Sequence, residues 1–427
     1  MKILLVQSWL GGDGPPVYPV GLACLAAALK GRHEVACCDP NVAPGPLGAL
    51  AHKLREFGPD LVGVSLRNID STNTRVSTSY LPPFQQVLNT VRTHFSGPLV
   101  VGGSGFSMFA QALMARYPSI DYGVYLEGEG TFAALADALA GRGDVAAVPS
   151  VYRRDSGQTV FSGPVAKADF SDLPAPDFTV LPLTPYTAVP WGIGVETKRG
   201  CAFSCLYCPY GFLNGRTYRR KAPERVAEEL AALKAQGLAR FTFLDSVFNA
   251  PADHAAAVME AMVRRNLRLS WSAWFTERGL SRDFLKLARR AGCDTVIFSP
   301  DAYGDAALRA LDKAVTRAEI DAAYALVRDM GCFDVSYNFF KNPPGQTLRD
   351  ALALLGFIVR ARRQLGKRAH FELSSLRVEP HTALAARAAA EGIVAPGADL
   401  LEPVRYTQGR TAYIEKFFDM LLKARGR

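Results

Sequence analysis

Long apolar runs are absent from this chain of 427 residues. No stretch approaches the roughly 18 consecutive apolar residues that a membrane-spanning helix needs, so we expect no membrane association. The mostly apolar run at residues 1–7 is far too short for a secretory signal and is better explained as a buried strand.

Cysteine is also scarce, with eight in the whole chain, and Cys37 and Cys38 are adjacent. So few cysteines in so long a chain exclude a disulfide-stapled fold and indicate a reducing compartment. We therefore expect a cytoplasmic protein.

The chain has a moderate net positive charge of +9 at pH 7, and its basic residues are not concentrated in one region of the sequence. Most basic residues are scattered along predicted helices and no recognisable nucleic-acid-binding module is present, so we expect no nucleic-acid partner. One compact basic cluster spans residues 216–221. Two interpretations of it stay open: the solvated start of a helix, or a docking point for an acidic electron donor of the flavodoxin or ferredoxin type.

Residues 1–145 alternate between strand-like and helix-like patterns. The predicted strands are 2–7, 34–38, 61–65, 99–101 and 122–126, and the predicted helices are 20–29, 47–57, 84–94, 107–117 and 131–140. Strands separated by helices predict an α/β domain with a Rossmann-like, doubly wound parallel sheet. Ligands of such sheets bind at the carboxyl ends of the strands, near Ser65, Arg67 and Gly102.

Residues 146–190 lose this alternation, and their prolines indicate a linker between domains. A second series begins at residue 191, with strands at 193–197, 241–245, 270–276, 295–299, 334–339 and 370–378 and helices at 223–236, 252–265, 282–291, 317–330 and 348–365. Six such units predict a partial (β/α)6 barrel of the TIM type over residues 191–385, with its chemistry at the carboxyl ends of the strands. We expect residues 386–427 to form a C-terminal extension that ends in a helix.

Three cysteines, Cys201, Cys205 and Cys208, fall in one short loop after the first strand of the second series. Their spacing, Cys-x3-Cys-x2-Cys, lets three thiolates reach three irons of one cubic cluster. No fourth cysteine follows, so one iron keeps an open position, unlike the irons of a cluster closed by four cysteines. Structural zinc is the alternative, although it normally takes four Cys or His ligands and the next histidine, His254, lies far along the chain.

The cysteine loop resembles the signature of the radical S-adenosylmethionine (SAM) superfamily, in which Tyr207 just before the last cysteine also fits. Segments similar to later landmarks of that family follow in its order, at residues 298–302, 342–347 and 375–384. In this family the open iron chelates the amino and carboxylate groups of SAM. The resemblance implies a [4Fe-4S] cluster on the three cysteines and SAM contacts from Phe203, Tyr207, Asp245, Asn249 and Ser299. For Asp245, the N-cap of a helix is the plain alternative.

The first half resembles the cobalamin-binding domains of one branch of this superfamily. The pair Gly102-Gly103 and the step Glu127-Gly128 match, but Trp9 stands where the family has the histidine that binds cobalt. The resemblance implies cobalamin without a protein histidine on cobalt, held by Trp9, Ser65, Gly102, Gly103, Glu127 and Gly128. A vestigial domain without a cofactor is the alternative.

Arg67 follows the third predicted strand, in the place of a leucine of the family's Ser-x-Leu step. Beneath a corrin ring, its charge would discourage a water ligand on cobalt and disfavour the higher charge states of the metal. Pairing with Asp70 at the end of the strand is the alternative interpretation.

Together these resemblances imply an enzyme, a cobalamin-dependent radical SAM C-methyltransferase acting on a small natural-product precursor. In this family a radical generated from SAM activates a carbon and methylcobalamin delivers the methyl group, and a polar variant uses the same parts. We predict Arg67 and Tyr337 as catalytic side chains, the latter because strand alternation can point it into the barrel. A packed hydrophobic core explains Tyr337 as readily. A radical SAM rearrangement or ring modification, an RNA methylthiotransferase and a non-enzymatic cobalamin or redox sensor remain alternatives.

Overall fold

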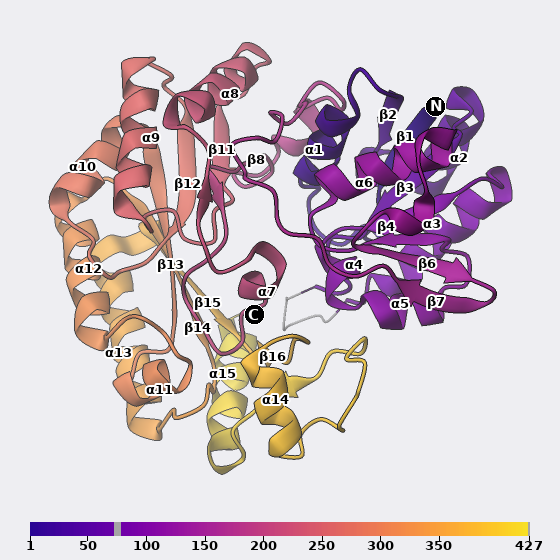
Figure 1. The fold of residues 1–427 in the computed structure, drawn as a ribbon. Helices are drawn as coiled ribbons and strands as arrows, with labels where there is room; N and C mark the ends of the chain where they lie inside the picture. Colours follow the sequence, from indigo (N-terminus) through magenta and orange to yellow (C-terminus); the bar gives the residue numbers. More distant parts are fainter. Residues whose placement is uncertain (72–77, 426–427) are drawn as a thin grey trace. The chain divides into compact units, whose positions relative to one another are not determined.

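The computed structural model describes residues 1–71 and 78–425. The chain divides into two compact units, Met1–Ile193 and Gly194–Arg427 (Figure 1). Within the described residues, no helix is both long and apolar enough to cross a membrane.

The first unit is built on a seven-stranded sheet in the order β2-β1-β3-β4-β5-β6-β7. Its strands are β1 (Lys2–Gln7), β2 (Glu34–Cys38), β3 (Leu61–Ser65), β4 (Leu99–Gly102), β5 (Tyr122–Val124), β6 (Val151–Asp155) and β7 (Gln158–Phe161). Its α-helices are α1 (Val20–Leu29), α2 (Pro46–Phe57), α3 (Leu81–His94), α4 (Ser104–Met108), α5 (Ala110–Arg116) and α6 (Gly128–Asp137). Strands β1 to β5 are parallel, which confirms the predicted doubly wound sheet. The strand order reverses between β1 and β3, so this is the switch point at which such sheets bind ligands.

The hairpin β6–β7 was not predicted. It pairs antiparallel to β5 and extends the sheet, although residues 146–190 had been interpreted as a linker. The two strands are short, and the prolines after them dominate the local pattern. The backbone hydrogen bonds that β6 makes with β5 stabilise the hairpin, which local strand propensity alone does not indicate.

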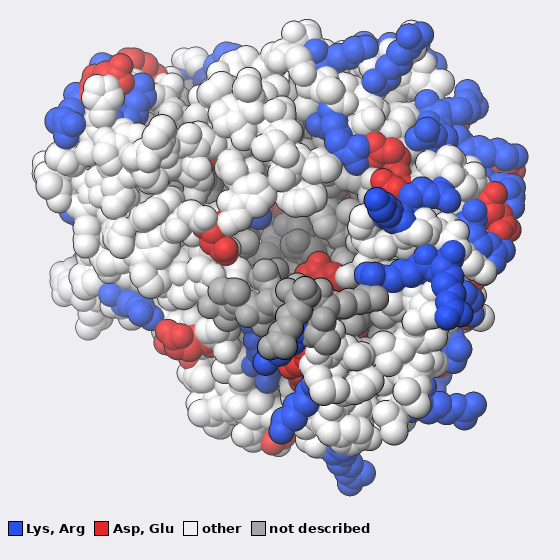
Figure 2. Space-filling view, turned by 180° about the vertical axis from the view of Figure 1, so that it is seen from behind, with Lys and Arg blue, Asp and Glu red and all other residues white. Residues whose placement is uncertain are grey.

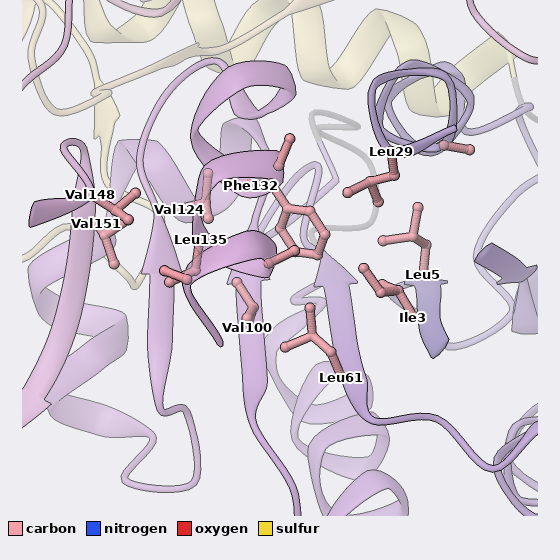
Figure 3. Close-up of a cluster of buried hydrophobic side chains, with 14 of the residues drawn as sticks. Ile3, Leu5, Leu29, Leu61, Val100, Val124, Phe132, Leu135, Val148 and Val151 are labelled. Carbon is pink, nitrogen blue, oxygen red and sulfur yellow. The ribbon is translucent and has the colours of Figure 1, made fainter. Parts of the chain in front are cut away.

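A hydrophobic core holds the helices of the first unit against its sheet (Figure 3). Phe132 of α6 and Leu29 of α1 pack over Leu5 and Leu61 of the central strands, and all four side chains are buried. Each such side chain contributes roughly 1.5–3 kcal/mol through burial. This packing fixes the sheet, and with it the loops at the carboxyl ends of β1, β3 and β4.

The second unit is a parallel six-stranded sheet in the order β15-β14-β13-β12-β11-β8, with helices along one side (Figure 1). Its strands are β8 (Gly194–Val195), β11 (Arg240–Phe243), β12 (Ser270–Phe275), β13 (Cys293–Asp301), β14 (Asp334–Phe340) and β15 (Ala369–Ser374). The helices between them are α8 (Pro223–Ala235), α9 (Ala252–Arg264), α10 (Arg282–Arg290), α11 (Asp305–Ala310), α12 (Arg317–Met330) and α13 (Leu348–Leu365). Neighbouring strands are consecutive in sequence, which confirms the predicted partial barrel.

The remaining elements of this unit are β9 (Lys198–Arg199), α7 (Tyr210–Asn214), β10 (Arg219–Arg220), β16 (Leu376–Arg377), α14 (Ala383–Ala390), β17 (Arg405–Tyr406) and α15 (Ala412–Arg425). At the end of β14, the buried Lys341 donates to Asp419 of α15 with 2.6 Å between Nζ and Oδ1. The C-terminal helix is therefore anchored to the carboxyl end of the barrel sheet.

Candidate active site

The cysteine loop leaves β9 at the carboxyl end of the first barrel strand. Gly200 precedes Cys201 with φ at +99°, and a side chain there would meet the carbonyl oxygen of Thr217 at 2.0 Å. Only glycine fits this turn. The turn directs the chain from β9 into the loop that carries the three cysteines.

Backbone hydrogen bonds hold the loop in place. The amide of Leu206 donates to the Leu311 carbonyl at 2.9 Å, and the Leu206 carbonyl accepts from Leu384 at 2.8 Å. Arg216 donates to the carbonyl of Phe203 at 2.9 Å. The loop is thus fastened to segments from three other parts of the unit, so its cysteines have defined positions.

Tyr207 is the central side chain of the loop. Its hydroxyl donates to Asp301, whose carboxylate also binds Lys313 with 2.7 Å between Nζ and Oδ2. The Tyr207 ring packs edge-on against Phe340. Burial and the adjacent Asp301 raise the Tyr207 pKa well above its usual value, so the phenol stays protonated and donates. The predicted role of Tyr207 as a cofactor contact stays a prediction, and its observed role is to fix the loop.

Burial raises the pKa of the Cys201, Cys205 and Cys208 thiols, that of Cys208 to about 12. Iron binding would displace the thiol protons, since coordinating thiols are deprotonated. Among the described residues, no three His, Cys, Asp or Glu side chains are grouped around a point that could hold a single metal ion. A cubic cluster has no such requirement, because each thiolate binds a different iron. Three thiols in one fixed loop therefore fit a cluster with one open iron.

Asp245 has different partners from the expected ones. It is almost fully buried, and its Oδ2 accepts from the Lys198 ammonium at 2.7 Å. The backbone amides of Thr197 and Lys198 and the Thr197 hydroxyl also donate to it. A carboxylate offers about four acceptor sites, and all four are used. Asp245 thus anchors the strand before the cysteines, and the contact with SAM predicted for it stays a prediction.

Asn249 and Ser299 lie near the carboxyl ends of the strands, as predicted, and both bind neighbouring segments. The Asn249 amide exchanges two hydrogen bonds of 2.8 Å with the backbone of Thr276. The Ser299 hydroxyl accepts from Asn338 at 3.1 Å. These contacts tie the ends of β11 to β12 and of β13 to β14. The cofactor-binding roles predicted for both residues, and for Phe203, stay predictions.

Tyr337 lies on the other side of its strand from the predicted one. Its ring is fully buried and contacts Phe298, Phe371 and, from α13, Phe357. Alternation along β14 places it on the face that the helices cover, where it packs in the core; the catalytic role predicted for Tyr337 stays a prediction. Its neighbour Asn338 faces the other way and binds Ser299.

The basic cluster at 216–221 is used largely within the protein. Lys221 is buried and binds Glu229 with 2.6 Å between Nζ and Oε2, and Arg220 lies 3.5 Å from Asp253. Arg216 binds the Phe203 carbonyl. On the face shown in Figure 2, Lys and Arg are most numerous along the right side, with Asp and Glu among them. The cluster therefore has structural partners, and the docking of an electron donor there stays a prediction.

In the first unit, Arg67 is exposed just after β3, at the switch point. Its carbonyl accepts from the Ser104 hydroxyl at 2.8 Å, and the preceding Leu66 amide donates to the Gly102 carbonyl at 2.8 Å. Gly103 has φ at +99°, and a side chain there would meet the Leu66 carbonyl at 2.7 Å. The glycine pair that was expected to approach a cofactor thus brings the loop after β4 against the backbone of Arg67 and fixes its position.

The loop after β1 is fixed at the same edge. The Ser8 amide donates to the Ser65 carbonyl at 2.9 Å, and the Asn41 amide nitrogen donates to the Ser8 carbonyl at 3.0 Å. The fully buried Ser8 hydroxyl has no hydrogen-bond partner among the described residues. An orphaned polar atom beside the half-buried Trp9 fits a ligand at the switch point.

Glu127 and Gly128 lie at the start of α6. The Glu127 carboxylate is 3.8 Å from the Lys167 ammonium, and a side chain at Gly128 would meet Leu25 of α1 at 3.2 Å. Gly128 therefore permits close packing of two helices. The cobalamin contacts predicted for Trp9, Ser65, Gly102, Gly103, Glu127 and Gly128 stay predictions.

Glu277 of the second unit is a buried polar residue that was not among the predicted site residues. Glu277, two residues after β12, is only 5% exposed, and its Oε1 has no hydrogen-bond partner among the described residues. Burial raises the pKa of this carboxyl to about 7. In the sequence, only its position after a predicted strand points to a functional role. The polar Thr276, Glu277 and Arg278 give no sign that Glu277 is buried, because its burial depends on packing against distant segments.

Two family models match the chain. The B12 binding domain matches residues 11–136, and the Radical SAM superfamily matches residues 195–358. Together the two matches cover more than half of the chain. They confirm the predicted order of a cobalamin-binding domain followed by a radical SAM domain.

Several curated relatives with similar sequences carry methyltransferase or methylase names. An uncharacterised methyltransferase of Pyrococcus horikoshii is 26% identical over 84% of this chain and 77% of its own length. The tryptophan 2-C-methyltransferase of Streptomyces laurentii is 27% identical over 67% of this chain, and the hopanoid C-3 methylase of Methylococcus capsulatus 25% over 76%. The matches span 58% and 61% of the lengths of the latter two relatives.

Solved structures share the fold. The radical SAM methyltransferase TsrM of Kitasatospora setae, determined with cobalamin and a [4Fe-4S] cluster, superimposes with a TM-score of 0.81 at 24% identity over 96% of this chain and 79% of its own. The cobalamin-dependent radical SAM enzyme OxsB gives 0.79 at 16% identity over 99% of this chain and 66% of its own. With the B12-binding model matched in the first unit and the Radical SAM model in the second, the chain belongs to the radical SAM superfamily and carries a B12-binding domain.

Proposed function

We propose that this protein is a cobalamin-dependent radical SAM enzyme that transfers a methyl group to carbon in a small molecule. The observation that carries the proposal is the pairing, in one chain, of a B12-binding unit with a fixed three-cysteine loop at the carboxyl ends of barrel strands. The methyltransferase names of the relatives support methyl transfer over rearrangement.

Cys201, Cys205 and Cys208 would hold the cluster, and the switch point of the first unit would hold cobalamin. When bound, the cluster and SAM supply one-electron chemistry and methylcobalamin supplies the methyl group. The contribution of the chain would be to fix the loop through Tyr207 and Asp301 and to bury Cys201, while Cys205 and Cys208 stay partly exposed.

Arg67 is proposed to act at the lower face of the corrin. The Ser104 hydroxyl donates to its backbone carbonyl and so fixes the position of the backbone. The Arg67 side chain is exposed, whereas the neighbouring Asp70 is buried. A guanidinium stays charged at every working pH. Near cobalt, this charge would oppose a water ligand and disfavour the more highly charged states of the metal. A histidine ligand on cobalt is not expected, because Trp9 occupies its place.

The substrate is proposed to be a small natural-product precursor. Support comes from the relatives, whose names include tryptophan 2-C-methyltransferase, and from the structure of TsrM with tryptophan and a SAM analogue bound. A reducing protein of the flavodoxin or ferredoxin type is proposed as the electron donor, and the cytoplasm as the compartment. A ring modification on the same scaffold is the second candidate, since one relative is an anaerobic magnesium-protoporphyrin IX monomethyl ester cyclase.

A labelling experiment tests the proposal without knowledge of the substrate. The anaerobically reconstituted protein, loaded with cobalamin and chemically reduced, is incubated with SAM that carries a labelled methyl group. We expect label in protein-bound methylcobalamin and formation of S-adenosylhomocysteine. Label that stays entirely in SAM, with cobalamin bound, would contradict methyl transfer and favour the second candidate.

A further inference from the structure

His381 has a backbone conformation that residues other than glycine seldom adopt. Its φ is +60°, and it lies between β16 and α14, directly before Thr382, the N-cap of α14. Histidine tolerates this left-handed region better than most residues, yet at a cost in free energy relative to glycine. His381 is also exposed, so burial of its side chain does not offset this cost. Residues held in this way often serve a function.

The His381 imidazole lies flat on the ring of Phe212. The two ring centroids are 4.0 Å apart and the ring planes differ by 9°. At this separation the faces of the two rings are in van der Waals contact, so the position of one ring constrains that of the other. Phe212 belongs to α7, which begins two residues after Cys208. The stack therefore joins the segment after β16 to the helix that follows the cysteine loop.

Helix α7 contacts the last cysteine of that loop. The backbone amide of Tyr210, at the start of α7, donates a hydrogen bond to the Cys208 sulfur. The amides of Phe212 and Leu213 donate to the Pro209 carbonyl at 3.0 and 2.9 Å and hold this turn together. Hydrogen bonds to cysteine sulfurs help to set the reduction potential of an iron–sulfur cluster. A movement of α7 would therefore change the potential of a cluster bound to Cys208.

A second contact connects the segment of His381 to the cysteine loop. The amide of Leu384 donates to the carbonyl of Leu206 at 2.8 Å, and Leu384 is fully buried. The Thr382 hydroxyl accepts from the Ala385 amide at 3.2 Å and fixes the start of α14. This segment thus holds the loop on both sides of Cys208, at Leu206 before it and at Phe212 after it.

We propose that His381 is a positioning residue of the cluster: its ring, stacked on Phe212, holds α7 against Cys208 and so sets the reduction potential of the cluster. The inference rests on the proposed cluster and extends it to a residue outside the cysteine loop. A role in folding alone explains His381 less well, because Leu384 and Thr382 already anchor the segment and glycine would avoid the unfavourable φ.

Two variants separate the ring contact from the backbone conformation. His381→Gly removes the ring and relieves the positive φ, whereas His381→Phe keeps a flat ring on Phe212. The midpoint potential of the reconstituted cluster is measured by redox titration followed by electron paramagnetic resonance. Urea denaturation of the cluster-free protein gives the free energy of unfolding. Ser156→Gly is the matched control, because Ser156 has a φ of +47° in the exposed turn between β6 and β7, in the other unit.

We expect His381→Gly to unfold no more easily than the wild type, since relief of the positive φ offsets the lost ring contact. Its cluster should be harder to reduce by at least threefold in the equilibrium constant, about 30 mV for one electron. His381→Phe and Ser156→Gly should keep the wild-type potential. Loss of the cluster in His381→Gly alone would also support the inference.

A wild-type potential and spectrum in His381→Gly would overturn the inference while leaving the cluster assignment intact. An equal shift of the potential in His381→Phe would overturn it as well, because the stacked ring is then retained without effect. A wild type that assembles no cluster would overturn the proposed function and this inference together.

Discussion

The Lys198 ammonium lies 2.7 Å from the Asp245 carboxylate, and both side chains are excluded from solvent. Lys198 also donates to the Phe248 carbonyl at 3.0 Å. Because Lys198 is three residues before Cys201, this pair ties the start of the cysteine loop to the strand that follows in the sheet.

Breaking this pair should destabilise the protein strongly. Lys198→Met leaves Asp245 buried without its cation, which should lower the free energy of unfolding by about 3–5 kcal/mol. Urea denaturation of the cluster-free protein measures this free energy of unfolding. Lys286→Met is the control, because Lys286 and its partner Asp283 are exposed and should contribute less than about 1 kcal/mol. Equal losses in the two variants would show that the buried pair has no special role.

The three cysteines of the loop should be the only protein ligands of the cluster. Cys205→Ala should lose most of the iron, because two thiolates cannot hold the cubane against solvent. Iron analysis and visible absorbance after anaerobic reconstitution report the loss. Cys293→Ala is the control, since Cys293 is buried at the start of β13, outside the loop. A full complement of iron in Cys205→Ala would refute the assignment.

Bound cobalamin should carry no histidine on cobalt, because Trp9 occupies the place of that ligand. The electron paramagnetic resonance spectrum of the Co(II) state should therefore show no splitting from an axial nitrogen. A clear triplet splitting would contradict this prediction. Absence of any corrinoid after reconstitution would favour a vestigial domain.

Arg67 should matter for turnover and not for assembly. Arg67→Leu and Arg67→Lys should bind corrinoid and assemble the cluster, yet methylate cobalamin from labelled SAM at least tenfold more slowly. Lysine keeps the charge but loses the planar fork of the guanidinium. Arg55→Leu, an exposed position on α2, is the control for loss of an arginine. Methyl transfer at the wild-type rate in Arg67→Leu would leave Arg67 as a surface residue.

Glu277 should make the cluster-free protein less stable as the pH rises. Its pKa is raised to about 7 in the folded state from an ordinary 4.5, so the folded protein holds a proton that the unfolded chain releases. The free energy of unfolding should fall between pH 4.5 and 7, by an amount on the order of 3 kcal/mol. Glu277→Gln should remove this part of the pH dependence. Parallel curves for variant and wild type in urea denaturation at pH 5 and pH 8 would contradict it.

Much of the fold could be predicted because the strands are marked by local signals. Buried parallel strands such as 2–7 and 61–65 are short apolar runs between helical patterns, and their predicted ends match the structure. The three cysteines were found because ligand spacing within one loop is itself a local property. The hairpin β6–β7 was missed, since its strands depend on pairing with β5.

The site was harder to predict, because its contacts join distant segments. The Asp245 partner Lys198 lies 47 positions away, so the sequence could not show that the carboxylate was already neutralised. The sequence alone could not decide which face of β14 the Tyr337 side chain occupies. The register of the strand decides between the helix-covered face and the interior. Glu277 was overlooked for the same reason, as its burial arises only from packing.

Iron and cobalt analysis of the anaerobically purified and reconstituted wild-type protein tests the central claim most directly. The account predicts about four irons held by the cysteine loop and about one cobalt, as corrinoid, in each chain. Zinc in place of iron, or a protein that retains no corrinoid, would contradict it.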